Sequence, residues 1–408
     1  MTHHPLQPTL RWARVCALLL CFTASAHAKE NVRTGWDFAG LPLVNFTTDR
    51  GMGYGAYVAA FYHGPEGAGD APYRASIGGQ FYQTTGGYAF HKFLLDIPNI
   101  AETGARFDLK SGYETWDSAW FFGVGDATPR LTPDDTPDGY YTSGLKSLWA
   151  IPTLRLPISG PWEVFLNYVY RSTDVEVFPD TRLAEDSPDG VEGGTLSMGS
   201  VGFAYDTRDR EPSTLRGVFS EGSVRLAHPA IGADWRFLGA NLTHRHWVPL
   251  WRDTLVFAYR LGFDWTRGAT PFFHQHILGG TEWVEMGGNV ALRGLPNGRY
   301  RGPITAYSNL ELRWTLGRYH WGPRTFDVLV APFVDLGRIW GDGGPAADGG
   351  IHASAGGGAR LVYNDVFVVR FDIAAGLEEY TSTDAPRGTA TDHRRPVLGV
   401  YAIVGHPF

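Results

Sequence analysis

The sequence contains little cysteine and no long apolar run. Its two cysteines, Cys16 and Cys21, lie near the start of the 408 residues, so the rest of the chain uses neither disulfides nor thiol chemistry. No stretch reaches the roughly 18 continuous apolar residues of a membrane-spanning helix, which excludes a helical membrane protein. Charged residues make up only 19%, the net charge is −7 and no basic block occurs, so no nucleic acid partner is expected.

Glycine and aromatic residues are abundant instead. Glycine accounts for 52 residues and aromatics for 14% of the chain. A disordered chain carries few aromatics, and collagen requires glycine at every third position, which is not seen here. A helical enzyme would lose about 1 kcal/mol at each glycine inside a helix. This composition favours a large all-β protein.

The first 28 residues are typical of a secretory signal peptide. Arg11 and Arg14 precede the short apolar core Val15–Phe22, and Ala26-His27-Ala28 matches an A-x-A cleavage site. Lipoprotein processing at Cys21 is the less favoured alternative, because Leu20 stands where a small residue is normal. The sequence therefore predicts export, with residues 1–28 removed.

Apolar and polar residues alternate along many segments. In Tyr307–Trp314, Leu310 and Leu312 share one side, while Glu311 and Arg313 share the other. The same alternation occurs in 105–111, 255–263 and 367–373. Successive side chains of a strand point to opposite faces, so each segment is predicted to be a strand with one apolar and one polar face.

The alternation fits either a soluble sandwich or a membrane barrel. Three features favour the barrel: polar faces with charges of both signs, recurrence over the whole chain, and aromatics crowded at strand ends as in interfacial girdles. The girdle residues expected to face lipid are Trp116, Trp120, Phe121, Phe122, Tyr140 and Tyr141. The chain also ends in Phe408, a common assembly signal of outer-membrane barrels.

Roughly sixteen alternating segments can be counted, with fourteen or eighteen as open alternatives. They begin near Leu41, Met52, Tyr73, Tyr88, Gly104, Thr142, Trp162, Leu196, Leu215, Trp235, Asp253, Ile304, Thr325, Ile351, Val366 and Val397. We expect an all-β, 16-stranded antiparallel transmembrane β-barrel over residues 41–408, after a short periplasmic segment at 29–40. The expected location is the outer membrane of a Gram-negative bacterium, among lipid and lipopolysaccharide.

The longest gap between predicted strands, residues 266–303, carries the most specific motifs. It contains a Gly279-Gly280 pair and the tetrapeptide Leu292-Arg293-Gly294-Leu295, followed by an N-G-R-Y-R-G run with Arg299, Arg301 and Gly302. This segment resembles the sixth extracellular loop of the BamA/TamA-like superfamily, the bacterial surface-antigen barrels. Leu295 departs from the aromatic residue that is more usual in the family.

Two other motifs carry the same resemblance. Phe333-Val334-Asp335-Leu336-Gly337 is similar to the family's F-x-D-x-G strand. A second motif, Y-D-T-R-D with a following proline and R-G, is similar to a family hairpin. Its residues are Tyr205, Asp206, Thr207, Arg208, Asp209, Pro212, Arg216 and Gly217.

The resemblance implies that the long loop folds into the barrel lumen. There Arg293, next to Gly294, is expected to meet Asp335, with Glu311 and Phe333 nearby. An arginine can bind a carboxylate through two parallel hydrogen bonds, and the loss of one partner in a dry site costs several kcal/mol. The alternative is that Arg293 is a solvated loop residue.

The resemblance also implies a non-enzymatic function without cofactors. A weakly paired seam between the first and last strands would aid the insertion or translocation of a client protein or lipid, and Pro407 is expected to shorten that pairing. Outer-membrane assembly machinery would be a partner during biogenesis. Family members usually carry POTRA domains, whereas about a dozen residues precede the first strand here, which resembles a short POTRA-less branch.

Two alternative functions stay open. One is a passive pore or surface antigen, and the other is a hydrolase with loop carboxylates such as Asp134-Asp135. Paired acidic residues beside proline are usually solvated turns. His244-x-His246 and His274-x-His276 offer too few ligands for a metal site, and Gly51-x-Gly53-x-Gly55 lacks the spacing of a nucleotide-binding loop.

Overall fold

The computed structural model describes most of the chain after residue 33. The described residues are 34–64, 73–126, 128, 130–131, 136–210, 213–281, 283–322, 324–341, 350–363, 367–381, 393–404 and 406–408. The predicted signal peptide, Asp134, Asp135 and Pro212 lie outside these residues.

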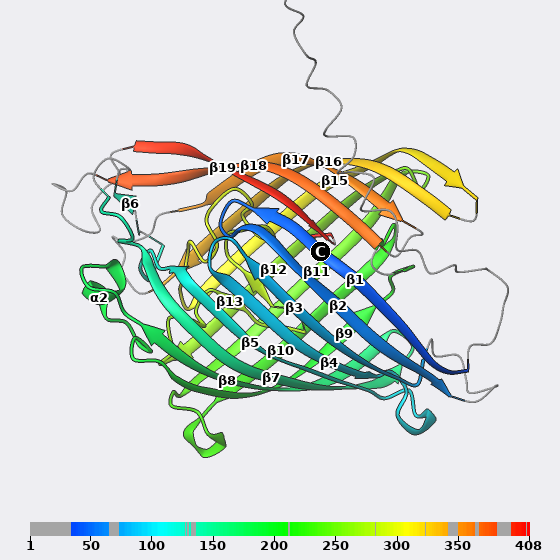
Figure 1. Ribbon diagram of the computed structural model, residues 1–408, viewed down its shortest axis with the longest axis horizontal. Helices are drawn as coiled ribbons and strands as arrows, with labels where there is room; N and C mark the ends of the chain where they lie inside the picture. Colours follow the sequence, from blue (N-terminus) through cyan, green and yellow to red (C-terminus); the bar gives the residue numbers. More distant parts are fainter. Residues whose placement is uncertain are drawn as a thin grey trace, which may run out of the picture.

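The fold is a closed antiparallel barrel of sixteen strands, as the alternation predicted (Figure 1). The first eight barrel strands are β1 (Gly35–Thr47), β2 (Gly51–Gly64), β3 (Ala75–Thr84), β4 (Tyr88–Ile97), β5 (Arg106–Trp120), β7 (Thr142–Ser159), β8 (Trp162–Glu176) and β9 (Gly194–Asp206). The other eight are β10 (Gly217–Ala227), β11 (Phe237–Trp251), β12 (Leu255–Gly268), β15 (Ile304–Trp321), β16 (Arg324–Trp340), β17 (His352–Tyr363), β18 (Phe367–Thr381) and β19 (His393–Val404).

A few short elements lie in the connections. The strand β6 (Arg130–Leu131) pairs parallel to the end of β18, and β13 (Ile277–Leu278) pairs with β14 (Val284–Glu285). The helices are η2 (Ile100–Glu102), α2 (Arg182–Asp186) and η3 (Pro229–Ile231). Among the described residues, no helix is long and apolar enough to cross a membrane.

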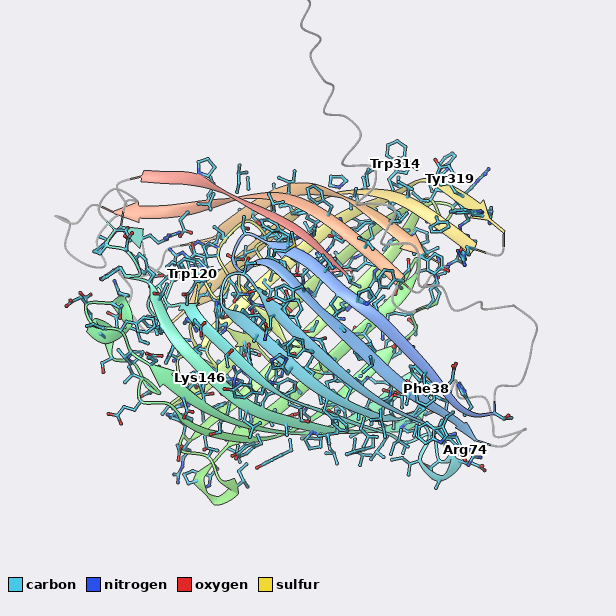
Figure 2. The ribbon with its side chains drawn as sticks, in the orientation of Figure 1. Phe38, Arg74, Trp120, Lys146, Trp314 and Tyr319 are labelled. Atoms are coloured by element: carbon cyan, nitrogen blue, oxygen red, sulfur yellow. The ribbon has the colours of Figure 1, made fainter. Side chains whose placement is uncertain are left out.

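The two faces of the strands separate as the sequence pattern predicted. In β15, Glu311 and Arg313 are buried in the lumen, whereas Leu312 and Trp314 point outward. Figure 2 shows Trp314 and Tyr319 standing out from the barrel wall. The outward side chains are largely apolar, and the lumen holds most of the buried charges. The polarity of the inner and outer faces is therefore the reverse of that in a soluble sandwich.

The first strand begins earlier than predicted. β1 starts at Gly35, so the expected boundary at Leu41 is wrong and the segment 29–40 is already strand from Gly35. β1 pairs antiparallel with β2 from Gly35↔Gly64 to Thr47↔Gly51, with one register shift between Gly35 and Trp36. Partners from this neighbouring strand therefore override the weak strand propensity of Gly35 and Gly40.

The predicted aromatic girdle is also wrong for the residues named. Trp116, Phe121, Phe122, Tyr140 and Tyr141 are buried, and Trp120 is partly buried. The connection between β5 and β7 folds back over the barrel mouth, where Phe121 lies 5.3 Å from Phe272 between ring centroids. The rings therefore pack against one another rather than against lipid. Large exposed aromatics near the strand ends are Trp36, Phe38, Trp162, Trp251 and Trp321.

Connections of different length lie at the two ends of the barrel. At one end are the long connections 121–141, 177–193 and 269–303, together with the short turns 48–50 and 85–87. At the other end are the short turns 160–161 and 252–254 and the connection 98–105. In barrels of this type the short turns face the periplasm and the long loops face outward.

Candidate functional site: the lumen loop and the barrel seam

Residues 269–303, here called the lumen loop, fold into the barrel between β12 and β15. The loop carries an apolar core that packs on the wall residues Tyr307 and Ile339. Its buried members are Leu278, Val284, Met286, Ala291, Leu292, Leu295 and Tyr300. Burial of these side chains holds the loop inside the lumen and fixes the position of its polar groups.

Arg293 and Asp335 meet as the resemblance implied. The Arg293 Nε and Nη2 atoms each donate to an Asp335 carboxylate oxygen at 2.8 Å, and the backbone N–H of Arg293 donates at 3.0 Å. Arg293 Nη1 lies 2.6 Å from Glu311 Oε1, and the guanidinium lies 3.4 Å from the centre of the Phe333 ring. All three charged side chains are fully buried.

Burial alone would lower the pKa of Arg293, but Asp335 and Glu311 raise it above its ordinary value. Arg293 is therefore a fixed positive charge, and a fork-shaped guanidinium suits this paired geometry better than an ammonium group does. The loop cannot leave the lumen without separating this buried pair.

The structure adds charged residues that the motifs did not identify. Arg313 Nε donates to Glu311 at 2.9 Å, and Arg360 and Arg370 both pair with Asp372, which lies 3.5 Å from Arg293. These residues come from β15, β17 and β18, so they converge only when the barrel closes. The sequence did contain one indication of Arg370 and Asp372, because both lie on the polar face of the alternating segment 367–373.

Position 294 requires a glycine. Its φ of +98° is in the left-handed region, and a Cβ there would lie 2.8 Å from the backbone nitrogen of Gly376. Its own N–H donates to the hydroxyl of Tyr401 at 2.9 Å. The glycine therefore lets the tip of the loop approach β18 and β19 closely.

The second part of the loop motif lies nearer the outer mouth. Arg299 contacts Glu378 and donates to Thr128 Oγ1 at 2.9 Å. Arg301 donates to the carbonyl oxygen of Phe272 within the loop at 2.8 Å, and to that of Trp120 at the end of β5 at 2.5 Å. A Cβ at Gly302 would collide with Ile339. Arg299 and Arg301 thus fasten the loop to the wall and to the outer connections rather than to Asp335.

Gly279 and Gly280 lie at a third anchor. The Gly279 N–H donates to Asp264 at 2.9 Å, beside the buried Arg225–Asp264 pair. A Cβ on Gly280 would lie 2.5 Å from Glu221 Oε1, whose carboxylate also accepts from Thr281. The glycines therefore let the loop backbone pass close to these lumen side chains.

The hairpin motif is not part of this site. Arg208 pairs with Asp206, and Asp209 accepts from the backbone of Arg216 in the turn between β9 and β10. A Cβ at Gly217 would collide with the Thr207 carbonyl. The structure therefore places these residues in a turn at the opposite end from the long loops, where Arg216 also pairs with Asp253 of the next turn.

The barrel closes at a short seam between β1 and β19. Within the described residues, their ladder has the pairs Phe46↔Ala402 and Thr47↔Tyr401. The Thr48 N–H extends the contact by one hydrogen bond to Val400 at 3.2 Å. Among the described residues, the ladder register of β1 from Gly35 to Asn45 is with β2 alone.

The lumen loop touches both sides of this seam. Gly294 reaches Tyr401 of β19, while Glu285 of the loop lies 3.6 Å from Arg50 in the turn between β1 and β2. The Arg50 guanidinium also stacks on Tyr88, 4.0 Å from the ring centre. Opening of the seam therefore changes contacts made by the loop.

After β19 the chain turns into the lumen. Arg260 Nη1 donates to the Pro407 carbonyl at 3.2 Å, and Arg313 Nη2 donates to a Phe408 oxygen at 3.0 Å. Phe408 packs with Phe219, and Figure 1 shows the C-terminus within the barrel outline. The ladder ends before Pro407, but whether this proline keeps it short stays a prediction.

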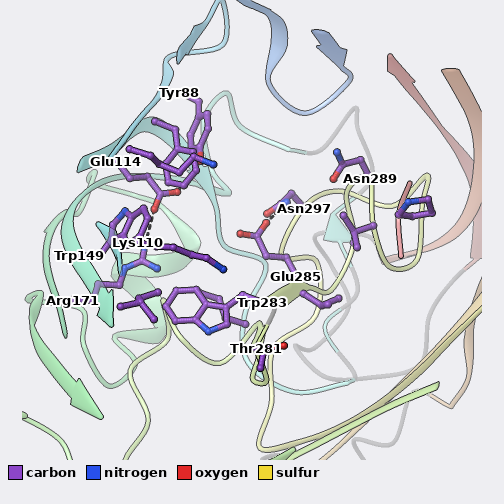
Figure 3. Close-up of a pocket in the computed structure, with 18 of the residues that line it drawn as sticks. Tyr88, Lys110, Glu114, Trp149, Arg171, Thr281, Trp283, Glu285, Asn289 and Asn297 are labelled. Carbon is purple, nitrogen blue, oxygen red and sulfur yellow. Dashed lines mark hydrogen bonds and ion pairs between the residues drawn. The ribbon is translucent and has the colours of Figure 1, made fainter. Parts of the chain in front are cut away.

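A cavity of about 500 Å³ lies between the lumen loop and strands β4 to β8. Figure 3 shows Lys110, Trp149, Arg171 and Trp283 around it. The cavity is lined by both charged and aromatic side chains, and it extends to Arg50 beside the seam.

The two histidine pairs have different settings. His244 and His246 face outward and share a hydrogen-bonded group with Ser220 and Tyr259. His276 is buried in the loop, where its Nδ1 lies 2.7 Å from Arg301 Nη1. Among the described residues, no group of three His, Cys, Asp or Glu side chains could hold a metal ion.

Comparison with known families and structures agrees with this geometry. The model of the Omp85 superfamily domain matches residues 95–389. BamA from Haemophilus ducreyi lacking POTRA domains 1–3 is similar with a TM-score of 0.59 and 16% identity, over 91% of this chain and 70% of that chain. No curated protein sequence was found to match.

CdiB structures are also similar. CdiB from Escherichia coli gives a TM-score of 0.55 and 13% identity, over 90% of this chain and 62% of that chain. CdiB from Acinetobacter baumannii gives a TM-score of 0.50 and 14% identity, over 91% of this chain and 60% of that chain. At these identities the likeness concerns the fold. Because the family model covers more than half of the chain, the protein belongs to the Omp85 superfamily and is an outer-membrane β-barrel.

Proposed function

We propose that the barrel opens at the β1–β19 seam to insert or translocate a client protein or lipid. The observation that carries this proposal is the short ladder at the seam. Among the described residues, β1 and β19 share two register pairs, whereas β1 and β2 are in register from Gly35 to Thr47. A short ladder needs less free energy to open, and the freed edges present unpaired N–H and C=O groups to an incoming strand.

The lumen loop holds the two sides of the seam together. The buried Arg293–Asp335 pair fixes the loop, and the contacts at Tyr401 and Arg50 join the fixed loop to both sides of the seam. The work is therefore non-enzymatic: binding energy from a client would replace contacts at the seam. Phe408 serves as the recognition residue for outer-membrane assembly machinery before it enters the closed lumen.

A reversible cross-link tests the seam. No cysteine follows Cys21, so a Phe46→Cys/Ala402→Cys pair introduces the bridge on a cysteine-free barrel. Directly opposed strand residues have a Cα separation that suits a disulfide. Oxidation should abolish acceleration of client-barrel folding, or lipid transfer, in liposomes, and a reductant should restore it.

The matched control places the same bridge away from the seam. Val44 and Tyr54 are opposed on β1 and β2, so Val44→Cys/Tyr54→Cys should leave the activity unchanged under oxidation. Full activity of the oxidised seam variant would reject the proposal. Conductance unchanged by Arg293→Ala would then favour a passive pore, and lipid or peptide cleavage lost in Asp134→Ala would favour a hydrolase.

A further inference from the structure

The lumen cavity beside the loop has an uneven charge distribution. Five cationic side chains line it against two carboxylates, in a chain whose net charge is −7. The cationic residues are Arg50, Lys92, Lys110, Arg171 and Arg260, and the acidic ones are Glu114 and Glu285. A concave site with a surplus of one sign attracts ligands of the other sign.

Much of the acidic charge is already paired. Arg171 Nη2 lies 3.1 Å from Glu114, and Arg50 lies 3.6 Å from Glu285. The Lys110 ammonium lies 3.9 Å from Asp108, a long contact for an ion pair. Among the described residues, no carboxylate lies within salt-bridge distance of Lys92, whose ammonium instead lies 4.9 Å from the centre of the Phe90 ring.

The two lysines come from neighbouring strands and share the cavity. Lys92 is on β4 and Lys110 is on β5, and Figure 3 shows the Lys110 side chain extending into the space. Two ammonium groups in one lumen site repel each other unless an anion lies between them. A phosphate group, with several acceptor oxygens, suits two such donors.

One part of the cavity wall is apolar and aromatic. Phe90 and Trp149 stack at 5.7 Å between ring centroids, with Ile151 and Trp283 beside them. Trp149 is 7% exposed, and among the described residues its Nε1 has no hydrogen-bond partner. The cavity therefore offers an apolar surface next to cationic groups and one unused buried donor, which is a combination suited to an amphiphile.

We propose that this cavity binds the phosphate-bearing headgroup of an anionic lipid, with Lys92 and Lys110 on the phosphate and the Trp149 wall on the glycerol and upper acyl region. Its volume of about 500 Å³ is in the range of small-molecule sites. This binding does not require the seam to open, so it stands apart from the insertion activity proposed above.

The test is a binding titration of the full-length barrel in detergent. The probes are short-chain phosphatidylglycerol, short-chain phosphatidylcholine and inorganic phosphate, followed by tryptophan fluorescence and native mass spectrometry. We expect phosphatidylglycerol to bind at least tenfold more tightly than either other probe. Lys92→Met/Lys110→Met should weaken that binding at least tenfold.

Lys146→Met is the matched control, because Lys146 is an exposed lysine of β7 outside the cavity (Figure 2). It should bind as the unaltered protein does. If the double variant fails to fold, Lys110→Met alone should weaken binding about threefold, since its side chain is 44% exposed and tolerates change. Unaltered affinity in a folded lysine variant, or no preference for phosphatidylglycerol, overturns the proposal; equal binding of inorganic phosphate assigns a free-phosphate site instead.

Discussion

The backbone N–H of Gly294 donates to the hydroxyl of Tyr401 at 2.9 Å, so the tip of the lumen loop is hydrogen-bonded directly to the last strand of the barrel. Tyr401 is also the residue that pairs with Thr47 across the seam. One residue therefore belongs both to the loop anchor and to the seam ladder, and this relationship makes the coupling between them testable.

Tyr401→Phe should loosen the seam without emptying its packing site. The substitution removes the hydrogen bond from Gly294, worth about 1 kcal/mol, together with the hydroxyl's contact to Thr48, and leaves the ring in place. We expect amide hydrogen exchange in β19 to rise about fivefold. Tyr319→Phe, whose ring is exposed on the outside of β15, is the control and should leave that exchange unchanged. An equal rise in both variants would contradict the coupling.

Arg293→Lys should destabilise the barrel although it keeps the charge. An ammonium group cannot reproduce the paired bonds to Asp335 or the stacking on Phe333, and disruption of a buried pair costs about 3–5 kcal/mol. The midpoint of guanidinium unfolding in lipid vesicles measures this. The exposed pair Arg216–Asp253 provides the control, since Arg216→Lys should change stability by less than about 1 kcal/mol.

Gly294→Ala should displace the lumen loop. The added Cβ meets backbone 2.8 Å away in a left-handed conformation, so both sterics and φ oppose it. We expect protease cleavage within 269–303 to increase. Gly160→Ala shares the positive φ but has open space around it, so it should leave cleavage of that loop unchanged.

Acid should release the lumen loop through its histidines. Burial, with Arg225 and Arg171 nearby, lowers the pKa of His274 to about 3, and burial beside Arg301 lowers that of His276 well below its ordinary value. The released loop then binds protons near pH 6.5 that the docked loop does not. Docking is therefore fully stable above about pH 6.5 and weakens as the pH falls, by about 1.4 kcal/mol per pH unit for each histidine.

The substitution His274→Phe tests this predicted pH dependence of loop docking. It removes the titrating group and keeps a ring beside Phe237 and Trp283. The fall in unfolding midpoint between about pH 8 and about pH 5 should become shallower than in the unaltered protein. A slope that does not change would assign the acid sensitivity to other groups.

The sequence by itself determined the strand class and the faces. Alternation has a period of two residues and is local, so Glu311, Asp335 and Arg370 were placed on inward or polar faces before any neighbour was known. The extended backbone then needs partners, and sixteen amphipathic strands with apolar outer faces satisfy that need by closing into a barrel in lipid.

Only the tertiary structure decided what lies opposite what. Asp372 and Arg360 reach the Arg293 site because β17 and β18 follow β16 around the closed barrel, a relation between residues far apart in the chain. The aromatics Phe122, Tyr140 and Tyr141 are buried because they pack against one another in the connection between β5 and β7. Among the described residues, the seam ladder has two register pairs, and no local pattern encodes the register at which a barrel closes.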